Sequence, residues 1–240
     1  IMSPRKKQKK KYHGFWVFIR MQVILILLVI GALAYYFFGG YAKQVQQLSA
    51  DAKQLVDSST KETFCASQTS IVYDAGGNQI STLKGEKDVY YLSLDEIPDY
   101  AKEAIISIED KKFYKHHGID YKAILRAVFA MIQNGEVTQG ASTITQQLAR
   151  TVFLTQEKTW QRKMEEIFIA TGLERKYSKD EILEFYLNNI YFGNGYYGIG
   201  AASKGYFDTD VENLDLAQLA YLCAIPNNPT LYDPATNSDN

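Results

Sequence analysis

The sequence has little cysteine and little histidine, and both shortages limit the chemistry that it can carry. Its two cysteines, Cys65 and Cys223, are too few for a disulfide framework, although one disulfide between them stays open. Cys223 lies in the apolar run LAYLCAI and is expected to be a small buried side chain. With three histidines, His13, His116 and His117, a histidine-rich metal site is not expected. The net charge of −1 gives no global field that would favour nucleic acid as a partner.

Charge is also absent from one long segment near the N-terminus. The run 21–42 carries no charged residue and follows a basic block at 5–11. At ~1.5 Å per helical residue it is long enough to cross the ~30 Å hydrocarbon layer of a bilayer. A signal peptide would have a shorter apolar core and a small-residue cleavage site, and a buried core helix rarely runs so long without a polar face. We therefore predict a transmembrane helix at 21–42, with the basic tail 1–20 cytoplasmic and the remaining chain outside.

The rest of the chain falls into three segments of different composition. Residues 43–69 are polar with sparse apolar positions, as in a juxtamembrane stalk. Residues 70–92 form a small β element, because the β-rich runs 70–73 and 79–83 flank the turn cluster DAGGN. Residues 93–240 show helical periodicity, which predicts a mainly α domain. Its helices are expected to end at Glu109-Asp110, to run from Tyr121 to Asn134, to begin near Ser142, and to span about 160–177, 179–191 and 215–225.

The stretch GASTITQQLAR, residues 140–150, combines small residues, hydroxyls and two glutamines. Thr143 and Gln146 have the spacing of a capping box, so a helix begins here with free backbone N–H groups, and such an N-terminus attracts anions. Arg150 could add a bidentate contact about two turns later. The cationic residues Lys158, Arg162 and Lys163 follow downstream. A capped surface helix followed by a solvated basic turn explains the spacing equally well.

Two further patterns contain carboxylates. In EDKKFYKHHG, Glu109 follows an aliphatic helical face, and partial desolvation would favour its use as a base. An acidic pair at a helix end is, however, more often plain surface polarity. Arg162 and Glu166 are four residues apart on one predicted helix, where a surface ion pair is the simpler interpretation.

Taken together, these segments resemble a known family. EDKKFYKHHG, GASTITQQLAR, QRKMEEIF, KDEILEFYLNNIYFGNGYYGIGAAS and LAQLAYLCAIPNNPTLYDP are similar, in this order, to the five signature blocks of the peptidoglycan glycosyltransferases (glycosyltransferase family 51). The resemblance covers roughly residues 92–234. It implies a lysozyme-like helical domain, tethered to the outer face of the cytoplasmic membrane, that polymerises lipid II into β-1,4-linked glycan with release of undecaprenyl diphosphate.

The resemblance also implies roles for individual residues. Glu109 matches the general base on the acceptor hydroxyl, and Glu166 matches a second glutamate associated with the donor's diphosphate. Implied substrate-binding residues are Asp110, Phe113, His116, Gly118, Ser142, Thr143, Gln146, Gln147, Arg150, Lys158, Arg162 and Lys163. The family often has Lys at the position of Arg150 and Arg at that of Lys158. Both positions stay cationic, but Arg and Lys differ in geometry and hydration, which leaves their individual roles less certain.

The implied partners are lipid II, the growing glycan strand, the membrane and the cell wall synthesis machinery, without nucleic acid. No cofactor is required, although Asp110, Glu166 and a bound diphosphate could share a divalent cation, Mg²⁺ or Mn²⁺. The β element 70–92 resembles the segment before this domain in bifunctional class A penicillin-binding proteins. The chain lacks the helix with which family members close the domain after the fifth block, so we expect it to be part of a longer protein.

Two rival functions fit parts of the pattern. A lysozyme-like enzyme that cleaves glycan would also use a glutamate such as Glu109 in a cleft. It would explain neither the hydroxyl and amide groups at 140–150 nor the membrane anchor. A non-catalytic membrane scaffold with the same fold would not need both Glu109 and Glu166.

Overall fold

The computed structural model describes residues 4–65, 70–76, 79–83, 90–134, 140–155 and 157–232. The chain divides into two units, Ile1–Leu48 and Ser49–Asn240. The first unit consists mainly of helix α1 (Pro4–Phe38). The second is mainly helical, so the predicted fold class is confirmed.

Helix α1 contains the long apolar segment. Its part Gly14–Phe38 has a mean hydropathy of 2.5 over 25 residues, and is long and apolar enough to cross a membrane. The helix ends at Gly39-Gly40, where Gly40 has φ +80°, and α2 (Tyr41–Ser58) begins directly afterwards. The glycine pair thus interrupts the helix within the predicted span 21–42, whose bounds in a membrane stay a prediction.

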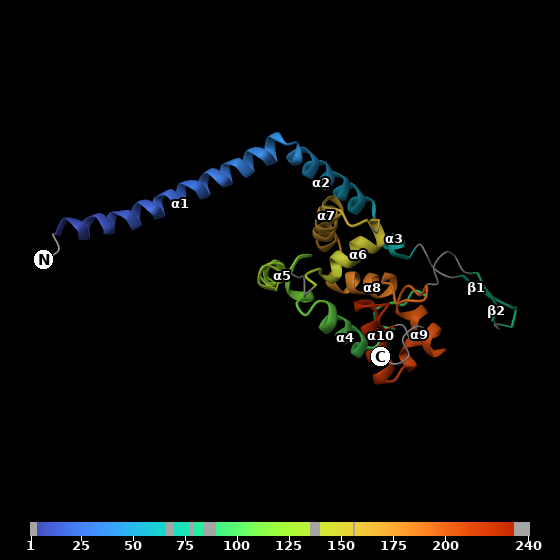
Figure 1. Cartoon of the computed structure of the whole chain (residues 1–240). Coiled ribbons are helices and arrows are strands. Elements are labelled where there is room, and N and C mark those ends of the chain that lie inside the picture. Colours follow the sequence, from blue (N-terminus) through green and yellow to red (C-terminus); the bar gives the residue numbers. More distant parts are fainter. Residues whose placement is uncertain are drawn as a thin grey trace. The chain divides into compact units, whose positions relative to one another are not determined.

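Eleven further helices and two strands follow in the described part of the second unit, and Figure 1 labels most of them. Four of the helices are short: α3 (Lys61–Cys65) and the 3₁₀ helices η1 (Phe113–Lys115), η2 (Val211–Asn213) and η3 (Ile225–Asn227). The longer ones are α4 (Asp99–Glu109), α5 (Tyr121–Asn134), α6 (Ile144–Phe153), α7 (Trp160–Lys176), α8 (Lys179–Asn189), α9 (Ile199–Phe207) and α10 (Leu216–Ala224). Strands β1 (Ser70–Tyr73) and β2 (Gln79–Leu83) pair antiparallel, with an irregularity between Val72 and Tyr73. Residues 77–78 of the predicted turn lie outside the described residues.

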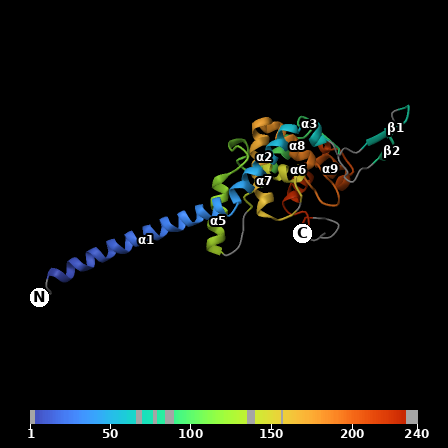
Figure 2. The same ribbon diagram turned by 90° about the horizontal axis from the view of Figure 1, so that it is seen from above.

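The core of the second unit forms around α6 and α8. Helix α6 packs against both α7 and α8, and α4 packs against α10, so helices that are distant in sequence share one core (Figures 1 and 2). Helix α8 is buried along most of its length, because Ile182, Leu183 and Phe185 are inaccessible to solvent. It starts with the predicted capping box, in which Ser178 and Glu181 satisfy each other's backbone N–H groups. The helices that carry the candidate site residues are therefore packed against this core.

The end of the predicted stalk belongs to this core. Phe64 of α3 is 2% exposed and stacks on Phe185 with ring centroids 4.0 Å apart. Val56 of α2 lies against Gly172 of α7, where an added Cβ would come within 3.0 Å of it. Lys176 Nζ donates to the carbonyl oxygens of Val56 (2.8 Å) and Asp57 (3.0 Å) at the end of α2. The C-terminal part of the predicted stalk is therefore helical and packs against α7 and α8.

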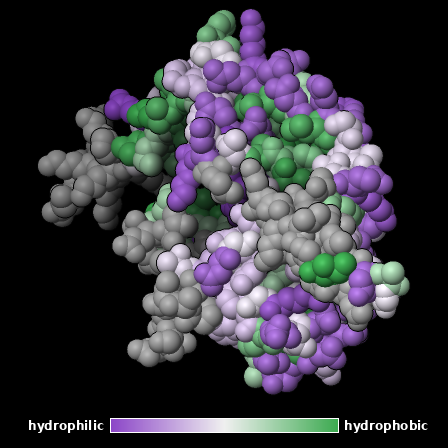
Figure 3. Space-filling view, turned by 90° about the vertical axis from the view of Figure 1, so that its right-hand side faces the viewer, coloured by the Kyte–Doolittle hydropathy of each residue, from purple (hydrophilic) through white to green (hydrophobic). Residues whose placement is uncertain are grey.

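Helix α5 spans the predicted residues but turns apolar side chains to the solvent. Tyr121, Leu125, Phe129 and Ile132 recur at helical spacing and are 69%, 59%, 64% and 70% exposed. Apolar residues also reach the surface in patches among polar ones on the face shown in Figure 3. Exposed apolar patches of this kind are typical of surfaces that bind a membrane or another protein.

The two cysteines do not form a disulfide, which settles the alternative that the sequence left open. Cys223 is fully buried in α10, and burial raises the pKa of its thiol to about 12. The Cys223 side chain therefore behaves as a small apolar group, as expected from its sequence context.

We predict that Phe64→Ala destabilises the domain by about 3–5 kcal/mol, because it leaves a cavity against Phe185 that the surrounding helices cannot fill. Urea unfolding followed by circular dichroism measures the change. Phe129→Ala is the control: it removes the same atoms from an exposed site and should change stability by less than about 0.5 kcal/mol. Equal losses in both variants would contradict the docking of α3 in the core.

Candidate active site

Two grooves lie beside the predicted site residues. The first, the Glu109 groove, has a volume of about 420 Å³ and is lined by Ile108, Glu109, Asp110, Lys111, Lys112, Asp120, Ala123, Arg126 and Gly140 to Thr143. The second, the cationic groove, has about 440 Å³ and is lined by Gln147, Arg150, Thr151, Lys158, Arg162, Ile190, Tyr191, Tyr197, Pro226 and Pro229. Both volumes are in the range of small-molecule sites.

The start of α6 is held by the predicted capping box. Thr143 Oγ1 accepts from the Gln146 backbone N–H (3.1 Å), and Gln146 Oε1 accepts from the Thr143 N–H (3.0 Å). The Thr143 hydroxyl also donates to the carbonyl oxygen of Gly118 at 2.7 Å. One buried side chain thus fixes both the helix start and the end of the EDKKFYKHHG loop.

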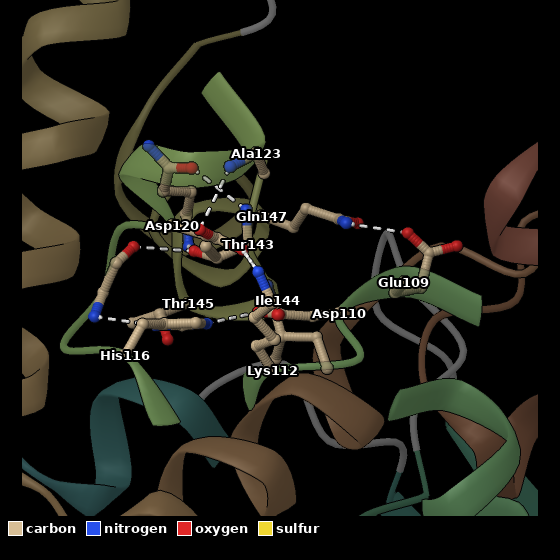
Figure 4. Close-up of polar contacts among 12 residues, drawn as sticks. Glu109, Asp110, Lys112, His116, Asp120, Ala123, Thr143, Ile144, Thr145 and Gln147 are labelled. Atoms are coloured by element: carbon tan, nitrogen blue, oxygen red, sulfur yellow. Dashed lines mark hydrogen bonds and ion pairs between the residues drawn. The ribbon is translucent and has the colours of Figure 1, made fainter. Parts of the chain in front are cut away.

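Asp110 joins the same two segments from the other side. Its Oδ2 accepts from the Ile144 backbone N–H (3.1 Å) and lies 2.7 Å from His116 Nε2 (Figure 4). His116 Nδ1 accepts from the Gly118 N–H at 3.1 Å, so the imidazole proton belongs on Nε2, where it donates to Asp110. The Asp110 carboxylate is 8% exposed and is the first acceptor for the positive end of α6.

These bonds correct one prediction made from the sequence. The backbone N–H groups of Ile144 and Gln146 are not free for an anion, because Asp110 and Thr143 already accept from them. Of the hydroxyls and amides of GASTITQQLAR, those of Thr143 and Gln146 build the helix start. Ser142 and Gln147 still line the grooves.

Three predicted substrate contacts lie beneath the loop and not in a groove. Phe113 is inaccessible to solvent, and His116 is 9% exposed. Gly118 has φ +88°, and a Cβ there would meet the Ala170 backbone of α7 at 3.0 Å, so only glycine fits. These three residues support the loop and line neither the Glu109 groove nor the cationic groove, and their part in substrate binding stays a prediction.

Glu109 lies at the end of α4 and lines the Glu109 groove. Its Oε2 accepts from Gln147 Nε2 at 2.8 Å, and Figure 4 shows the Gln147 side chain reaching toward it. Asn227 Nδ2 lies 3.5 Å from the other carboxylate oxygen of Glu109, Oε1, and this distance is the upper limit for a hydrogen bond. Glu109 lines one groove and Gln147 lines the other, so the hydrogen bond between these two side chains links the walls of the two grooves.

Glu166 is fully buried and gathers two cations. Its Oε2 accepts from Arg162 Nη1 at 2.9 Å, and its Oε1 pairs with Lys163 Nζ. Lys163 Nζ also donates to Ser142 Oγ at 3.0 Å, which links α7 to the Glu109 groove. A buried carboxylate holding two cations fixes their positions, and it is not itself reachable by a ligand. Glu166 thus sets the positions of Arg162 and Lys163 and has no contact with solvent itself.

The cationic groove adds two further positively charged side chains, Arg150 and Lys158. Arg150 follows Gln147 along α6, and Lys158 is exposed in the connection to α7. Together with Arg162 they give the groove three cationic groups along one wall. Such an arrangement suits a ligand with two or more negative charges, such as a diphosphate.

The sequence did not single out some of the residues that shape this site. Tyr186 of α8 is buried with its hydroxyl 3.2 Å from Gln147 Oε1, and Asn227 approaches Glu109. Tyr191 and Tyr197 pair in the cationic groove with ring centroids 5.0 Å apart. A signal existed for Tyr186, because a tyrosine on a buried helical face needs a hydrogen-bond partner. The pattern alone could not say which partner.

Comparisons with known proteins give one consistent result. The family model described as transglycosylase matches residues 76–240. Penicillin-binding protein 1A/1B of Bacillus subtilis (strain 168) is 41% identical over 238 residues, covering 99% of this chain and 25% of that protein. Penicillin-binding protein 1F of the same organism is 42% identical over 230 residues, covering 96% and 30%. The chain thus spans less than a third of the length of these relatives.

A solved structure is also similar, at lower identity. The crystal structure of penicillin-binding protein 1A from Haemophilus influenzae is 19% identical, with 71% of this chain and 15% of that chain covered. The TM-score of the pair is 0.34.

We predict that Thr143→Ala lowers the free energy of unfolding by about 1–2 kcal/mol, because it removes the N-cap of α6 and the bond to Gly118. Urea unfolding measures the loss. Thr143→Ser keeps the hydroxyl and should recover most of the stability. A serine variant as unstable as the alanine variant would mean that the methyl group, and not the cap, matters here.

Proposed function

This chain belongs to the transglycosylase family, and on that premise we propose that it is a peptidoglycan glycosyltransferase that polymerises lipid II into β-1,4-linked glycan strands. The observation that carries the proposal is the position of Glu109. Its carboxylate lines the Glu109 groove and accepts a hydrogen bond from Gln147, which lines the cationic groove together with Arg150, Lys158 and Arg162. A base next to a cationic groove is what glycosyl transfer from a diphosphate requires.

In the proposed reaction, Glu109 accepts the proton of the acceptor sugar's hydroxyl as its oxygen bonds to the anomeric carbon of the donor. The bond from that carbon to the diphosphate oxygen breaks with inversion, and undecaprenyl diphosphate leaves as an anion. Arg150, Lys158 and Arg162 stabilise the charge on the leaving group, with Lys163 beside them. Because the diphosphate leaves as a stabilised anion, no general acid is needed.

The supporting residues have roles that follow from their contacts. Glu166 holds Arg162 and Lys163 in place, and Ser142 receives a bond from Lys163. Asp110 and Thr143 fix the start of α6, which carries Gln147. The tyrosines of the cationic groove offer flat faces on which a sugar ring could rest.

We propose that the protein needs no resident cofactor. A divalent cation would have to displace existing partners from the two predicted carboxylates, since Asp110 bonds His116 and Glu166 is paired with Arg162 and Lys163. Within the described residues, no group of three or more His, Cys, Asp and Glu side chains is placed to hold a metal ion. These carboxylates therefore fit Mg²⁺ or Mn²⁺ poorly, and a cation would bind chiefly through the diphosphate oxygens of the substrate.

We also propose a membrane location for the reaction. The helix Gly14–Phe38 would anchor the chain with the basic tail in the cytoplasm and the second unit outside, where it meets the machinery of cell wall synthesis. The exposed apolar ridge of α5, formed by Tyr121, Leu125, Phe129 and Ile132, would rest in the bilayer surface. This placement suits a substrate whose lipid stays in the membrane.

We predict that Glu109→Gln lowers the rate of polymerisation by about 10²–10⁴-fold, because the amide cannot accept the acceptor's proton. The detergent-solubilised chain and the variant are incubated with labelled lipid II, and the products are sized on a gel. Long glycans from the parent and none from the variant are expected. Cleavage of preformed glycan by the parent would instead indicate a hydrolase, and equal ladders from both would exclude Glu109 as the base.

We predict that α5 enters the bilayer surface. An environment-sensitive fluorophore on Phe129→Cys, in a Cys65→Ser background, should shift to shorter wavelengths when the chain is moved into liposomes and be quenched by lipid-borne quenchers. Tyr100→Cys on α4 is the control, because Tyr100 is 67% exposed and thus matches Phe129. The same spectrum at both positions would rule out a membrane contact specific to α5.

A further inference from the structure

The residue behind the catalytic candidates is Tyr186. It lies on α8 with its side chain inaccessible to solvent, and its hydroxyl donates to Gln147 Oε1 at 3.2 Å. Gln147 in turn donates from Nε2 to Glu109 Oε2 at 2.8 Å. The three side chains come from α8, α6 and α4, and they form one chain of hydrogen bonds that ends on the carboxylate.

The Gln147 amide has two orientations, and they are unequal in this environment. In the observed orientation the amide oxygen faces a hydroxyl donor and the amide nitrogen faces a carboxylate. If the amide turned over, its oxygen would face the Glu109 carboxylate, and two acceptors would oppose each other. The Tyr186 proton would also lose its acceptor, because in the part of the chain that the structure describes this hydroxyl bonds to Gln147 alone. A buried donor left unsatisfied is costly.

Tyr186 is suited to this task because its hydroxyl keeps its proton. Burial raises the pKa of the Tyr186 hydroxyl well above its usual value, and the nearby negative charge of Glu109 raises it further, although Arg150 opposes this. The phenol is therefore a hydrogen-bond donor throughout the pH range in which the protein works.

We propose that Tyr186 is a positioning residue for the reaction: its hydroxyl fixes the Gln147 amide, which holds the Glu109 carboxylate toward the acceptor hydroxyl. The inference rests on the proposed glycosyltransferase function and extends it by one residue that touches neither substrate nor product. Because Tyr186 acts through Gln147, its loss affects turnover and leaves substrate binding nearly unchanged.

A double-mutant cycle on the full chain tests the proposal, with kcat and KM for labelled lipid II measured in detergent. Tyr186→Phe keeps the ring and removes one hydrogen bond, so kcat should fall roughly 5- to 10-fold with little change in KM. Gln147→Met removes the amide at similar volume. In the Gln147→Met background, Tyr186→Phe should cause no further loss of kcat, because the hydroxyl has nothing left to orient.

The control is Tyr177→Phe, which removes the hydroxyl of a half-buried tyrosine that bonds to Ser59 and not to Gln147. It should keep the parent kcat, and melting temperatures check that all variants are folded. A Tyr186→Phe variant at the parent kcat would overturn the inference, as would losses that multiply in the double variant. A parent chain that makes no glycan would overturn the proposed function, and the inference with it.

Discussion

The anchoring of the N-terminus of α6 is the interaction on which the rest of the site depends. Thr143 and Asp110 bind the first turn of this helix and, through Gly118 and His116, the loop that follows Glu109. The helix start and the loop are thereby fixed to each other, and Gln147, one turn later, arrives within hydrogen-bond reach of Glu109. A base is useful only when its distance from the reacting proton is fixed, and here buried polar contacts fix it.

The site separates groups that line the grooves from groups that hold others in place. The Arg162 side chain lines the cationic groove and is 14% exposed, and that of Lys163 is 42% exposed, while the glutamate that pairs with both is fully buried. The same division applies to Glu109, which lines a groove, and Tyr186, which lies beneath it. Because buried partners hold these cations in position, little reorganisation would be needed when an anionic ligand binds.

Local signals in the sequence predicted the helices well, but they could not predict contacts between residues that are distant in the chain. The capping boxes of α6 and α8 follow from residues three apart, and both are present. By contrast, Tyr186 lies 39 residues from Gln147, and nothing in the spacing joins them. Helical periodicity located α5 but could not say that its apolar ridge faces outward, since a buried face and a membrane-facing one have the same pattern. The sequence placed Phe64 in the predicted stalk, because the rings that it packs against, Phe153 and Phe185, belong to helices much later in the chain.

The anomeric configuration of the newly formed glycosidic bond tests the central claim most directly. If Glu109 acts as a base and the cations carry the leaving diphosphate, displacement occurs in one step and the configuration inverts. Proton NMR of the product from an α-linked diphosphate donor should then show the coupling constant of a β-glycoside. A product with the α configuration would mean two successive displacements through a covalent intermediate, with a carboxylate as nucleophile, and would contradict the account.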